Sequence, residues 1–249
     1  MKKAIIIAVY LLVITLILAA SGQAQSIPKV SVELTESESP SDLSSTLQVV
    51  LLLTILTLAP SIILMITSFI RMIIVLGFLR QAMGTQQLPP NQLILSLALI
   101  LTFFIISPIA NQAYNEGLKP YLDEQITKEE AFEKGIAPFK KFMLAQTREK
   151  DLALFVNISG MEQPKNADDI PLHVLIPGFV ISELRTGFQI AFLIFIPFLI
   201  IDMVVASVLM SMGMMMLPPI IVSLPFKILL FVLVDGWYLL VKSLVESFM

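Results

Sequence analysis

The sequence predicts an all-α protein of the integral membrane type, made of helical hairpins with a small helical domain outside the membrane. Three observations support this fold class. Of the 249 residues, 57% are hydrophobic and 14% charged, and the mean hydropathy is +0.89, whereas roughly 25% of a soluble domain is charged. Apolar runs of about the length of a membrane helix recur from residue 46 onwards. Half of the charged residues fall in one central segment, residues 111–170.

The composition excludes several kinds of site. There is no cysteine, which excludes disulfides, thiolate chemistry and Cys-based metal centres. The one histidine, His173, cannot form a His-based metal or haem site within one chain. A net charge of −3 does not indicate a nucleic-acid partner, and no phosphate-binding glycine loop, nucleophile elbow or zinc-protease motif occurs. We therefore expect no cofactor, no metal and no catalytic activity.

The N-terminal segment, residues 1–24, has the three regions of a secretory signal peptide. Two lysines precede an apolar run over residues 4–18 and a small-residue site that ends at Ala24. The competing interpretation is a retained membrane helix, but a span needs about 20 apolar residues. We expect cleavage after Ala24, which places the mature N-terminus outside the cytoplasmic membrane. Residues 25–45 then form a flexible acidic tail.

The first apolar helical region covers residues 46–110. A single helix over residues 46–79 would be about 50 Å long, which exceeds one membrane span. Pro60 either kinks a long tilted helix or divides the segment near residue 60 into two shorter helices, and the sequence leaves both open. Arg71 and Arg80 have no acidic residue nearby and indicate the cytoplasmic side.

A polar turn over residues 81–92 leads to the next apolar helix. We expect that helix over residues 93–109, ended by Ser107 and Pro108. Its 17 residues are short for a membrane span and fit a helix inside a protein bundle at least as well.

Residues 111–170 are expected to form the small extracytoplasmic helical domain. Thr127 and Glu130 have capping-box spacing, which predicts that an amphipathic helix begins after Thr127. Pro138 is expected to end or kink that helix. A second amphipathic helix is predicted from Phe139 to Asp151, with its phenylalanines covered by another surface.

The second apolar helical region covers residues 171–249 and carries Glu183 and Arg185 two residues apart. Charges in an apolar setting are costly unless they are paired, and side chains at positions i and i+2 do not face each other on a helix. Each charge therefore pairs with another element or another subunit, or else lies exposed at the membrane interface. The sequence leaves these alternatives open.

Four further charges are candidates for buried pairs: Arg71, Asp202, Lys227 and Asp235. Asp202 lies near the end of a helix predicted over residues 190–209. Lys227 and Asp235 are eight residues apart, so about two helical turns place them on one face. They indicate either a structural ion pair or a proton relay, which normally needs several ionisable groups along one path.

Hydropathy predicts four membrane spans, at about residues 47–70, 92–110, 186–208 and 220–241. Because the signal peptide is expected to be removed, this order places the charged central segment outside the membrane. It places the turn before the last span toward the cytoplasm.

That turn is rich in methionine. It contains five methionines, one glycine and two prolines: Met210, Met212, Met214, Met215, Met216, Gly213, Pro218 and Pro219. Methionine is flexible and polarizable and forms apolar surfaces that repack against varied shapes, while the glycine and the prolines interrupt a regular helix. On these residues alone, the turn is either a deformable apolar seal or a membrane turn with methionine as filler.

Two function classes remain: a pore or transport component, and a purely structural or interaction subunit. A small-solute transporter would usually show polar substrate-binding residues at repeat-related positions in broken helices, and the sequence shows no convincing internal repeat. A small-solute or proton channel subunit is kept as the alternative function.

Long motifs occur in a fixed order from about residue 46 to the C-terminus. They are Phe69–Arg80 with Gly84–Gln92, Phe179–Ile190, Phe195–Asp202, Met210–Pro219 with Leu224–Lys227, and Val234–Trp237. Together they resemble the FliP family, the flagellar export-gate proteins whose injectisome counterpart is SctR. The resemblance implies a pore-forming core subunit of the flagellar type III protein export gate, without catalytic residues because export is powered elsewhere.

The resemblance also implies partners and site residues. Proteins of this family form a pentamer that joins FliQ and FliR in a helical assembly around the channel for unfolded flagellar subunits. That assembly lies in the inner membrane at the flagellar basal body, with other export proteins such as FlhA and FlhB. Met214, Met215 and Met216 match the family's methionine constriction, and Gly213 with the two prolines would let the loop project into the channel. Glu183 matches a position implicated in subunit contacts, and we expect the same of Arg185.

Overall fold

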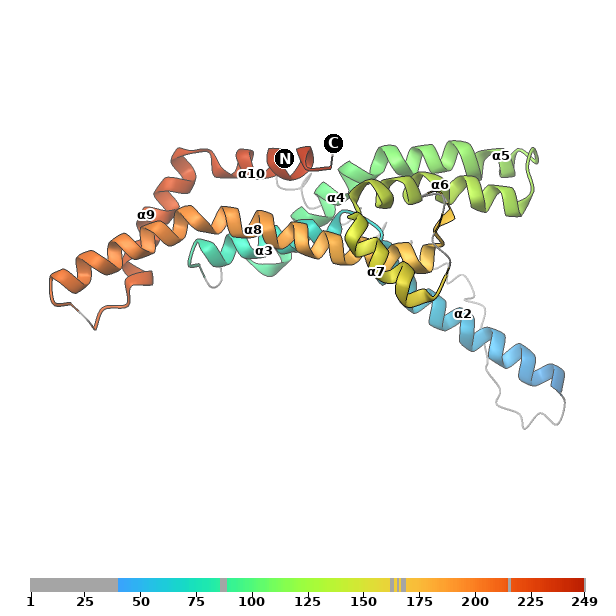
Figure 1. Ribbon diagram of the computed structural model, residues 1–249, viewed down its shortest axis with the longest axis horizontal. Coiled ribbons are helices and arrows are strands. Elements are labelled where there is room, and N and C mark those ends of the chain that lie inside the picture. The colour runs from blue at the N-terminus through green and yellow to red at the C-terminus, as the bar shows by residue number, and fades with distance from the viewer. Residues whose placement is uncertain are drawn as a thin grey trace, which may run out of the picture. The chain divides into compact units, whose positions relative to one another are not determined.

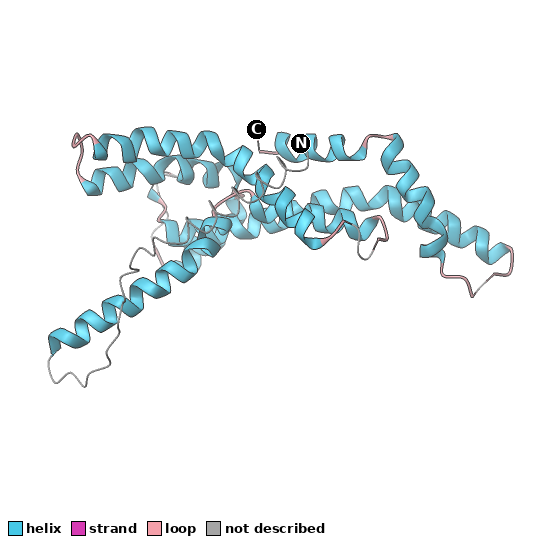
Figure 2. Ribbon diagram, turned by 180° about the vertical axis from the view of Figure 1, so that it is seen from behind, coloured by secondary structure: helices cyan, strands magenta, loops and turns pink. Residues whose placement is uncertain are grey.

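The computed structural model describes residues 40–85, 89–161, 164, 166, 169–214 and 216–248, and these residues form helices without any strand (Figure 1, Figure 2). The predicted all-α class is therefore confirmed. The predicted signal peptide and residues 25–39 of the predicted tail lie outside the described residues. In chain order the helices are α2 (Pro40–Met65), α3 (Phe69–Ala82), α4 (Asn91–Ala113), the π-helix η1 (Tyr114–Leu118), α5 (Lys119–Leu122), α6 (Lys128–Gln146), α7 (Glu149–Ser159), α8 (Leu172–Ser211), α9 (Pro219–Leu233) and α10 (Gly236–Glu246).

The chain divides into two units, residues 1–54 and residues 55–249, and α2 crosses the boundary between them. α2 begins at Pro40, within the range expected to be a tail. The stretch Leu47–Met65 of α2 is long enough to span a membrane, is apolar on all sides and is not buried in any part. A helix of this kind is typical of a membrane span.

The apolar segment after residue 46 forms two helices, and the break lies at residues 66–68. Pro60, the expected kink or division, lies inside α2. The hydroxyl of Thr67 donates a hydrogen bond to the carbonyl of Leu64 at 3.0 Å, and such local bonds compete with the helical ladder. The polar pair Thr67–Ser68 therefore separates the helices, and the prediction of a division near Pro60 is wrong in position.

Proline also fails to end two helices, although an end was predicted at Pro108 and an end or a kink at Pro138. α4 continues past Pro108 as far as Ala113, and α6 continues past Pro138 as far as Gln146. A proline inside a helix removes one backbone hydrogen bond and costs about 3 kcal/mol, which favourable packing of a long helix offsets. Pro138 is itself buried against neighbouring elements.

α4, η1 and α5 pack against α6 as a hairpin (Figure 1). The predicted start of α6 is confirmed, because Thr127 Oγ1 accepts a hydrogen bond from the Glu130 N–H and the Glu130 carboxylate accepts one from the Thr127 N–H, both at 3.3 Å. The two sides of the hairpin approach each other closely at Gly117 and Gly135. A Cβ atom on Gly117 would lie 2.7 Å from backbone atoms of Gly135, so only glycine fits at this position.

The second amphipathic helix of this region begins later than predicted. Phe139, Phe142 and Met143 lie on α6, and α7 begins only at Glu149. The extended backbone of Thr147, with ψ of 131°, separates the two helices. Phe142 and Met143 are covered as expected, since they are buried in a cluster that includes residues of α7 and α8.

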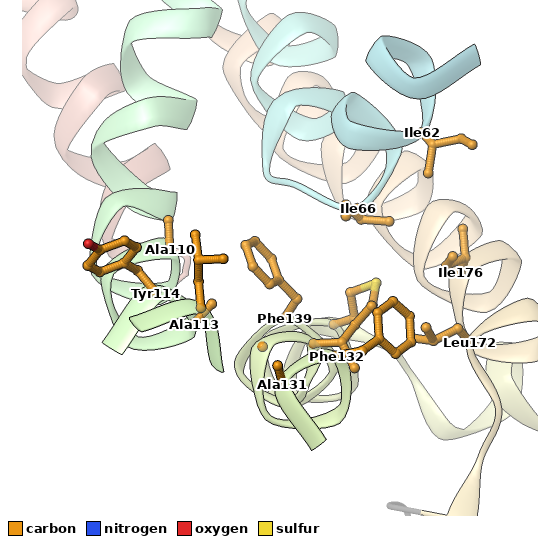
Figure 3. Close-up of a pocket in the computed structure, with 14 residues that line it drawn as sticks. Ile62, Ile66, Ala110, Ala113, Tyr114, Ala131, Phe132, Phe139, Leu172 and Ile176 are labelled. Atoms are coloured by element: carbon orange, nitrogen blue, oxygen red, sulfur yellow. The ribbon is translucent and has the colours of Figure 1, made fainter. Parts of the chain in front are cut away.

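An apolar pocket of about 660 Å³ lies along one side of the hairpin (Figure 3). Residues from α2, α4, η1, α6 and α8 surround it, including Ile66, Ala110, Tyr114, Phe139 and Ile176. Apart from Tyr114, its lining side chains are apolar. The described residues therefore fill this face of the hairpin only in part.

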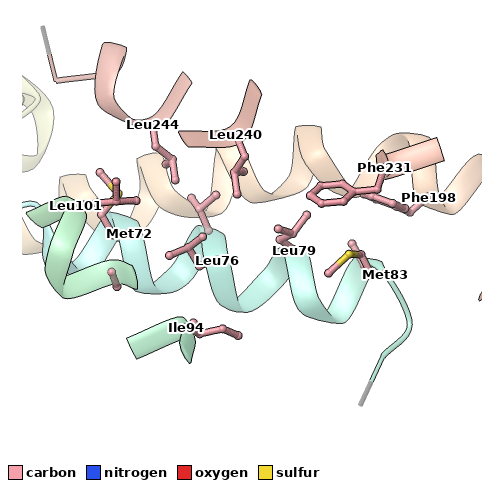
Figure 4. Packing of buried hydrophobic residues seen from close by; sticks show 13 residues of the cluster. Met72, Leu76, Leu79, Met83, Ile94, Leu101, Phe198, Phe231, Leu240 and Leu244 are labelled. Carbon is pink, nitrogen blue, oxygen red and sulfur yellow. The ribbon is translucent and has the colours of Figure 1, made fainter. Parts of the chain in front are cut away.

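α3 is the centre of the largest buried cluster (Figure 4). Met72, Val75, Leu76 and Leu79 are at most 2% exposed. They pack against buried residues of four other helices, α4, α8, α9 and α10: Ile94, Ala98, Leu101, Phe198, Phe231, Leu240 and Leu244. α3 therefore fixes the position of α8 and α9, the two helices that carry the methionine turn.

α8 is one continuous helix of 40 residues, whereas the sequence predicted a span over residues 186–208. At about 60 Å it is twice as long as a bilayer core of about 30 Å is thick. Among the described residues, three helices are long and apolar enough to cross a membrane: Leu47–Met65, Asn91–Leu122 and Leu172–Ser211. α9 and α10, bent by 64°, would make a fourth if they count as one span.

Candidate functional site

The methionine loop, residues 212–218, connects α8 to α9. α8 ends in a Schellman motif, in which the Met214 N–H donates to the Leu209 carbonyl at 3.0 Å and the Gly213 N–H donates to the Met210 carbonyl at 3.1 Å. Gly213 has a φ of +76°, a conformation that is strained for any residue with a side chain. The glycine therefore ends α8 sharply and turns the chain into the loop.

The other end of the loop is made by two prolines. Pro218 is the N-cap of α9 and Pro219 occupies its first position. The first helical N–H has no partner within a helix, so proline loses no hydrogen bond there and its fixed φ suits the helix. The break in helical structure thus falls at the glycine and the prolines.

Most of the described apolar side chains of the methionine loop are exposed. Met216 is 99% exposed and Met212 is 65% exposed. Met210, in the last turn of α8, is 62% exposed. Met214 is half-buried, and Met215 lies outside the described residues. Contiguous exposed apolar side chains mark surfaces that contact something other than their own chain.

A buried lysine fixes the base of the α8–α9 hairpin. Lys227 of α9 is 2% exposed, and its ammonium donates to Asp202 Oδ2 of α8 at 2.6 Å and to the Ala82 carbonyl at the end of α3 at 3.1 Å. The Ser223 hydroxyl donates to Asp202 Oδ1 at 2.5 Å. The partial negative charge at a helix C-terminus also stabilises the ammonium. These contacts hold three helices together below the loop.

Asp235 does not take part in this cluster, although its spacing placed it on the face of Lys227. α9 ends at Leu233, and Asp235 has a φ of +52° before α10 begins. A left-handed residue interrupts the helical periodicity on which the spacing argument depends. The partner of Lys227 is therefore Asp202, from the preceding helix.

A second buried charge joins α3 to α8. Arg71 is 2% exposed and forms a bidentate ion pair with Glu183, which is 0% exposed. The Nε of Arg71 donates to Glu183 Oε2 at 3.0 Å, and the Nη2 of Arg71 donates to Glu183 Oε1. Nη2 also donates to Gln146 Oε1 at 3.0 Å, and Nη1 donates to the Ser247 carbonyl at 2.9 Å and hydroxyl at 2.8 Å. The guanidinium lies 3.7 Å from the ring centre of Phe248. All five N–H donors of the arginine are thus satisfied.

The two residues predicted as subunit contacts have different surroundings. Glu183 is enclosed by its own chain and holds Arg71. Arg185 is exposed and makes no ion pair or hydrogen bond with any described residue. A role of either residue between subunits stays a prediction, and in these surroundings Arg185 is the more accessible of the two.

Sequence reasoning missed several members of these clusters. Gln146 and Ser247 lie 75 and 176 residues from Arg71, and no local spacing connects residues that far apart. Ser223 could have been found, because it lies four residues before Lys227, and positions i and i+4 share a helix face. The described residues contain no group of three His, Cys, Asp or Glu side chains that could hold a metal ion.

Comparison with known proteins agrees with the motifs in the sequence. The model of the FliP family matches residues 52–244. The chain is 58% identical over 212 residues to the flagellar biosynthetic protein FliP of Bacillus subtilis (strain 168), covering 85% of this chain and 96% of that protein.

Two further relatives bear the same name. The flagellar biosynthetic protein FliP of Caulobacter vibrioides is 51% identical over 252 residues, covering 100% of this chain and 92% of that protein. That of Aquifex aeolicus (strain VF5) is 48% identical over 235 residues, covering 94% of this chain and 97% of that protein. The family model and these relatives cover both apolar regions and the methionine loop between α8 and α9. The chain therefore belongs to the FliP family.

Proposed function

We propose that this protein is a pore-forming core subunit of the flagellar type III protein export gate. As a member of the FliP family it is a component of the flagellar export apparatus and not an enzyme. In the finer proposal, copies of the chain, five by resemblance, assemble with FliQ and FliR around a channel for unfolded flagellar subunits. The assembly lies at the basal body in the inner membrane, with FlhA and FlhB among its neighbours.

The exposed methionine loop is the observation that carries this proposal. Met216 is almost fully exposed at the tip of a hairpin whose two helices end and begin at fixed points. A soluble turn would carry polar residues there, because each exposed apolar Å² forgoes about 25 cal/mol of burial free energy. The loop is therefore suited to contact apolar loops of neighbouring copies or a polypeptide in transit.

The proposed mechanism follows from the physical chemistry of methionine. Several loops that meet on one axis would form an apolar constriction, and a narrow apolar constriction excludes water and ions. Because thioether side chains have three rotatable bonds and are polarizable, they can repack around side chains of many shapes. The cluster of Lys227, Asp202 and Ser223 would hold the base of each loop while its tip yields.

The buried charges support a structural role over a proton path. Arg71 has all five donors occupied, and Lys227 donates to a carboxylate and a helix carbonyl. A proton relay needs ionisable groups that exchange protons along one path, whereas these two clusters are separate and firmly hydrogen-bonded. They suit a scaffold that keeps its shape when the loop moves.

Replacing Met212, Met214 and Met216 together with alanine is expected to make cells permeable to ions, because the constriction would then be wider and less apolar. The measurement is the conductance of membranes that contain the assembled complex. The control replaces Met65 and Met203, which are also exposed but lie outside the loop, with alanine. Equal conductance in the loop variant, the control and the unaltered complex would contradict the seal.

A further inference from the structure

Two charges in the second apolar region have no partner among the residues that the structure describes. After residue 171 there are seven Asp, Glu, Lys and Arg residues. Five of them are paired: Glu183 with Arg71, Asp202 with Lys227, and Lys242 with Glu246 at 3.8 Å. The two that remain, Arg185 and Asp235, are opposite in sign, and neither side chain makes an ion pair or a hydrogen bond with any described residue.

Arg185 begins an apolar stripe along α8. We call the Arg185 stripe the residues Arg185, Phe188, Phe192, Phe195 and Leu199, which follow one another at spacings of three and four. Such spacing forms a seam to which another helix packs. The five residues line one side of a groove of about 990 Å³ between α8 and α3. Phe188 packs edge-to-face on Phe78 of α3 and Phe195 is half-buried. Phe192 at the centre is 64% exposed, so the described residues cover the seam only in part.

Asp235 ends a second apolar stripe, along α9. We call the Asp235 stripe the residues Ile221, Pro225, Ile228 and Val232 of α9, which follow one another at spacings of four and three, together with Asp235 in the turn just after α9 ends at Leu233. All five are exposed, with Ile221 at 67% and Val232 at 69%. The carboxylate of Asp235 does not cap α10, although the residue is its N-cap. Its carboxylate therefore has no partner among the described residues and lies just beyond the end of an exposed apolar seam.

We propose that the Asp235 stripe of one copy of this chain packs antiparallel on the Arg185 stripe of a second copy. The apolar part of each stripe, Phe188–Leu199 on α8 and Ile221–Val232 on α9, extends over 11 residue steps, about 17 Å of helix. If Arg185 faces Asp235, the reversed order of spacings brings Phe188 opposite Val232, Phe192 opposite Ile228, Phe195 opposite Pro225 and Leu199 opposite Ile221. Every apolar residue then has an apolar neighbour, and the two free charges meet at one end.

Burial explains why the occupant is a second copy and not lipid. A partner that covers the groove also removes water from Arg185, and a charge in apolar surroundings must be paired. Hydrocarbon chains supply no counter-charge, whereas a second copy supplies Asp235 at the end of a seam of the same length. The contact joins two different surfaces, so repetition produces a ring or a helical assembly. It rests on the self-association contained in the proposed function.

Reversal of one charge tests this contact. Arg185→Glu and Asp235→Arg are each expected to reduce the oligomer recovered in mild detergent about tenfold, because like charges would meet in a dry seam. Both changes in one chain restore the pair with reversed polarity and should return recovery to the unaltered level. Lys242→Glu is the control, since Lys242 is exposed on α10 outside both stripes. Both charges are exposed, so the amount of folded monomer should not change.

Cross-linking tests the register. The chain has no cysteine, so co-expressed copies with Phe192→Cys and with Ile228→Cys should be joined by a short bis-maleimide. Copies with Phe192→Cys and with Ile221→Cys, about 10 Å away along α9, should be joined much less. The contact would be overturned if both single reversals left the amount of oligomer unchanged. It would also be overturned if the double change did not restore an oligomer that the single changes had lost. In the first case the oligomer is intact, so the proposed function would still stand. A chain that forms no oligomer with its partners would overturn both.

Discussion

Replacing Arg71 with methionine is expected to lower the free energy of unfolding by about 3–5 kcal/mol, because it leaves the carboxylate of a fully buried Glu183 without its counter-charge. The loss extends to Gln146 and Ser247, whose acceptors face the guanidinium. Thermal unfolding of the protein in detergent should show a melting temperature lower by about 10 °C, since 1 kcal/mol corresponds to roughly 2–4 °C in a chain of this size.

Two comparisons isolate the ion pair from the size of the side chain. Arg71→Lys keeps the charge but has three donors for five acceptors, so its stability should lie between those of the unaltered protein and Arg71→Met. Arg71→Met combined with Glu183→Leu removes both charges and should recover part of the loss. The control is Arg80→Met, a change on the same helix at an exposed hydrogen bond to Asn91. Equal melting temperatures for Arg71→Met and Arg80→Met would contradict the account.

Replacing Asp202 with asparagine is expected to destabilise the protein more than replacing Lys227 with methionine. The first change leaves an ammonium group that is 3% exposed without a counter-charge, and the second leaves a carboxylate side chain that is 24% exposed. Because water solvates the carboxylate in part, Lys227→Met should cost about 2 kcal/mol, and Asp202→Asn should approach the roughly 3–5 kcal/mol of a fully buried pair.

The same unfolding measurement checks the order of the two losses. The double change Asp202→Asn with Lys227→Met should cost less than the sum of the single changes, since the residues contact each other. Lys242→Met at the exposed pair with Glu246 is the control and should stay within about 1 kcal/mol of the unaltered protein. A larger loss for Lys227→Met than for Asp202→Asn would show that burial does not determine the cost.

Local patterns predicted the parts of the fold that depend on short stretches of chain. The capping box at Thr127 begins α6, and Gly213 with Pro218 separates α8 from α9. Each depends on hydrogen bonds or backbone angles within about six residues, which the sequence displays directly. The all-α class followed in the same way from long apolar runs.

Proline misled the prediction of helix ends where packing determines the length of a helix. Pro108 and Pro138 lie inside α4 and α6, and Pro177 and Pro197 lie inside α8. The cost of one lost hydrogen bond is local, whereas the gain from a long helix that covers a cluster is spread over many distant residues. The sequence displays the local cost of a proline but not the packing gain of the long helix.

The sequence indicated the four charged residues of the two buried ion pairs but not how they pair. Arg71, Glu183, Asp202 and Lys227 were all identified as charges in apolar surroundings. Their pairing depends on which helices lie side by side, and Arg71 and Glu183 are 112 residues apart. For Asp235 the spacing itself was misleading. Its own left-handed backbone conformation ends the helical periodicity, so the side chain does not lie on the face that the spacing indicated.

The central claim is that the methionine loop contacts the polypeptide during export. The chain has no cysteine, so Met216→Cys introduces its only thiol at the tip of the loop. An export substrate with one cysteine, stalled by a stably folded domain at its C-terminus, should be joined to this thiol by a short bis-maleimide. Ile158→Cys, at an exposed position on α7, should give no such product. Substrate joined at Ile158→Cys but not at Met216→Cys would contradict the claim.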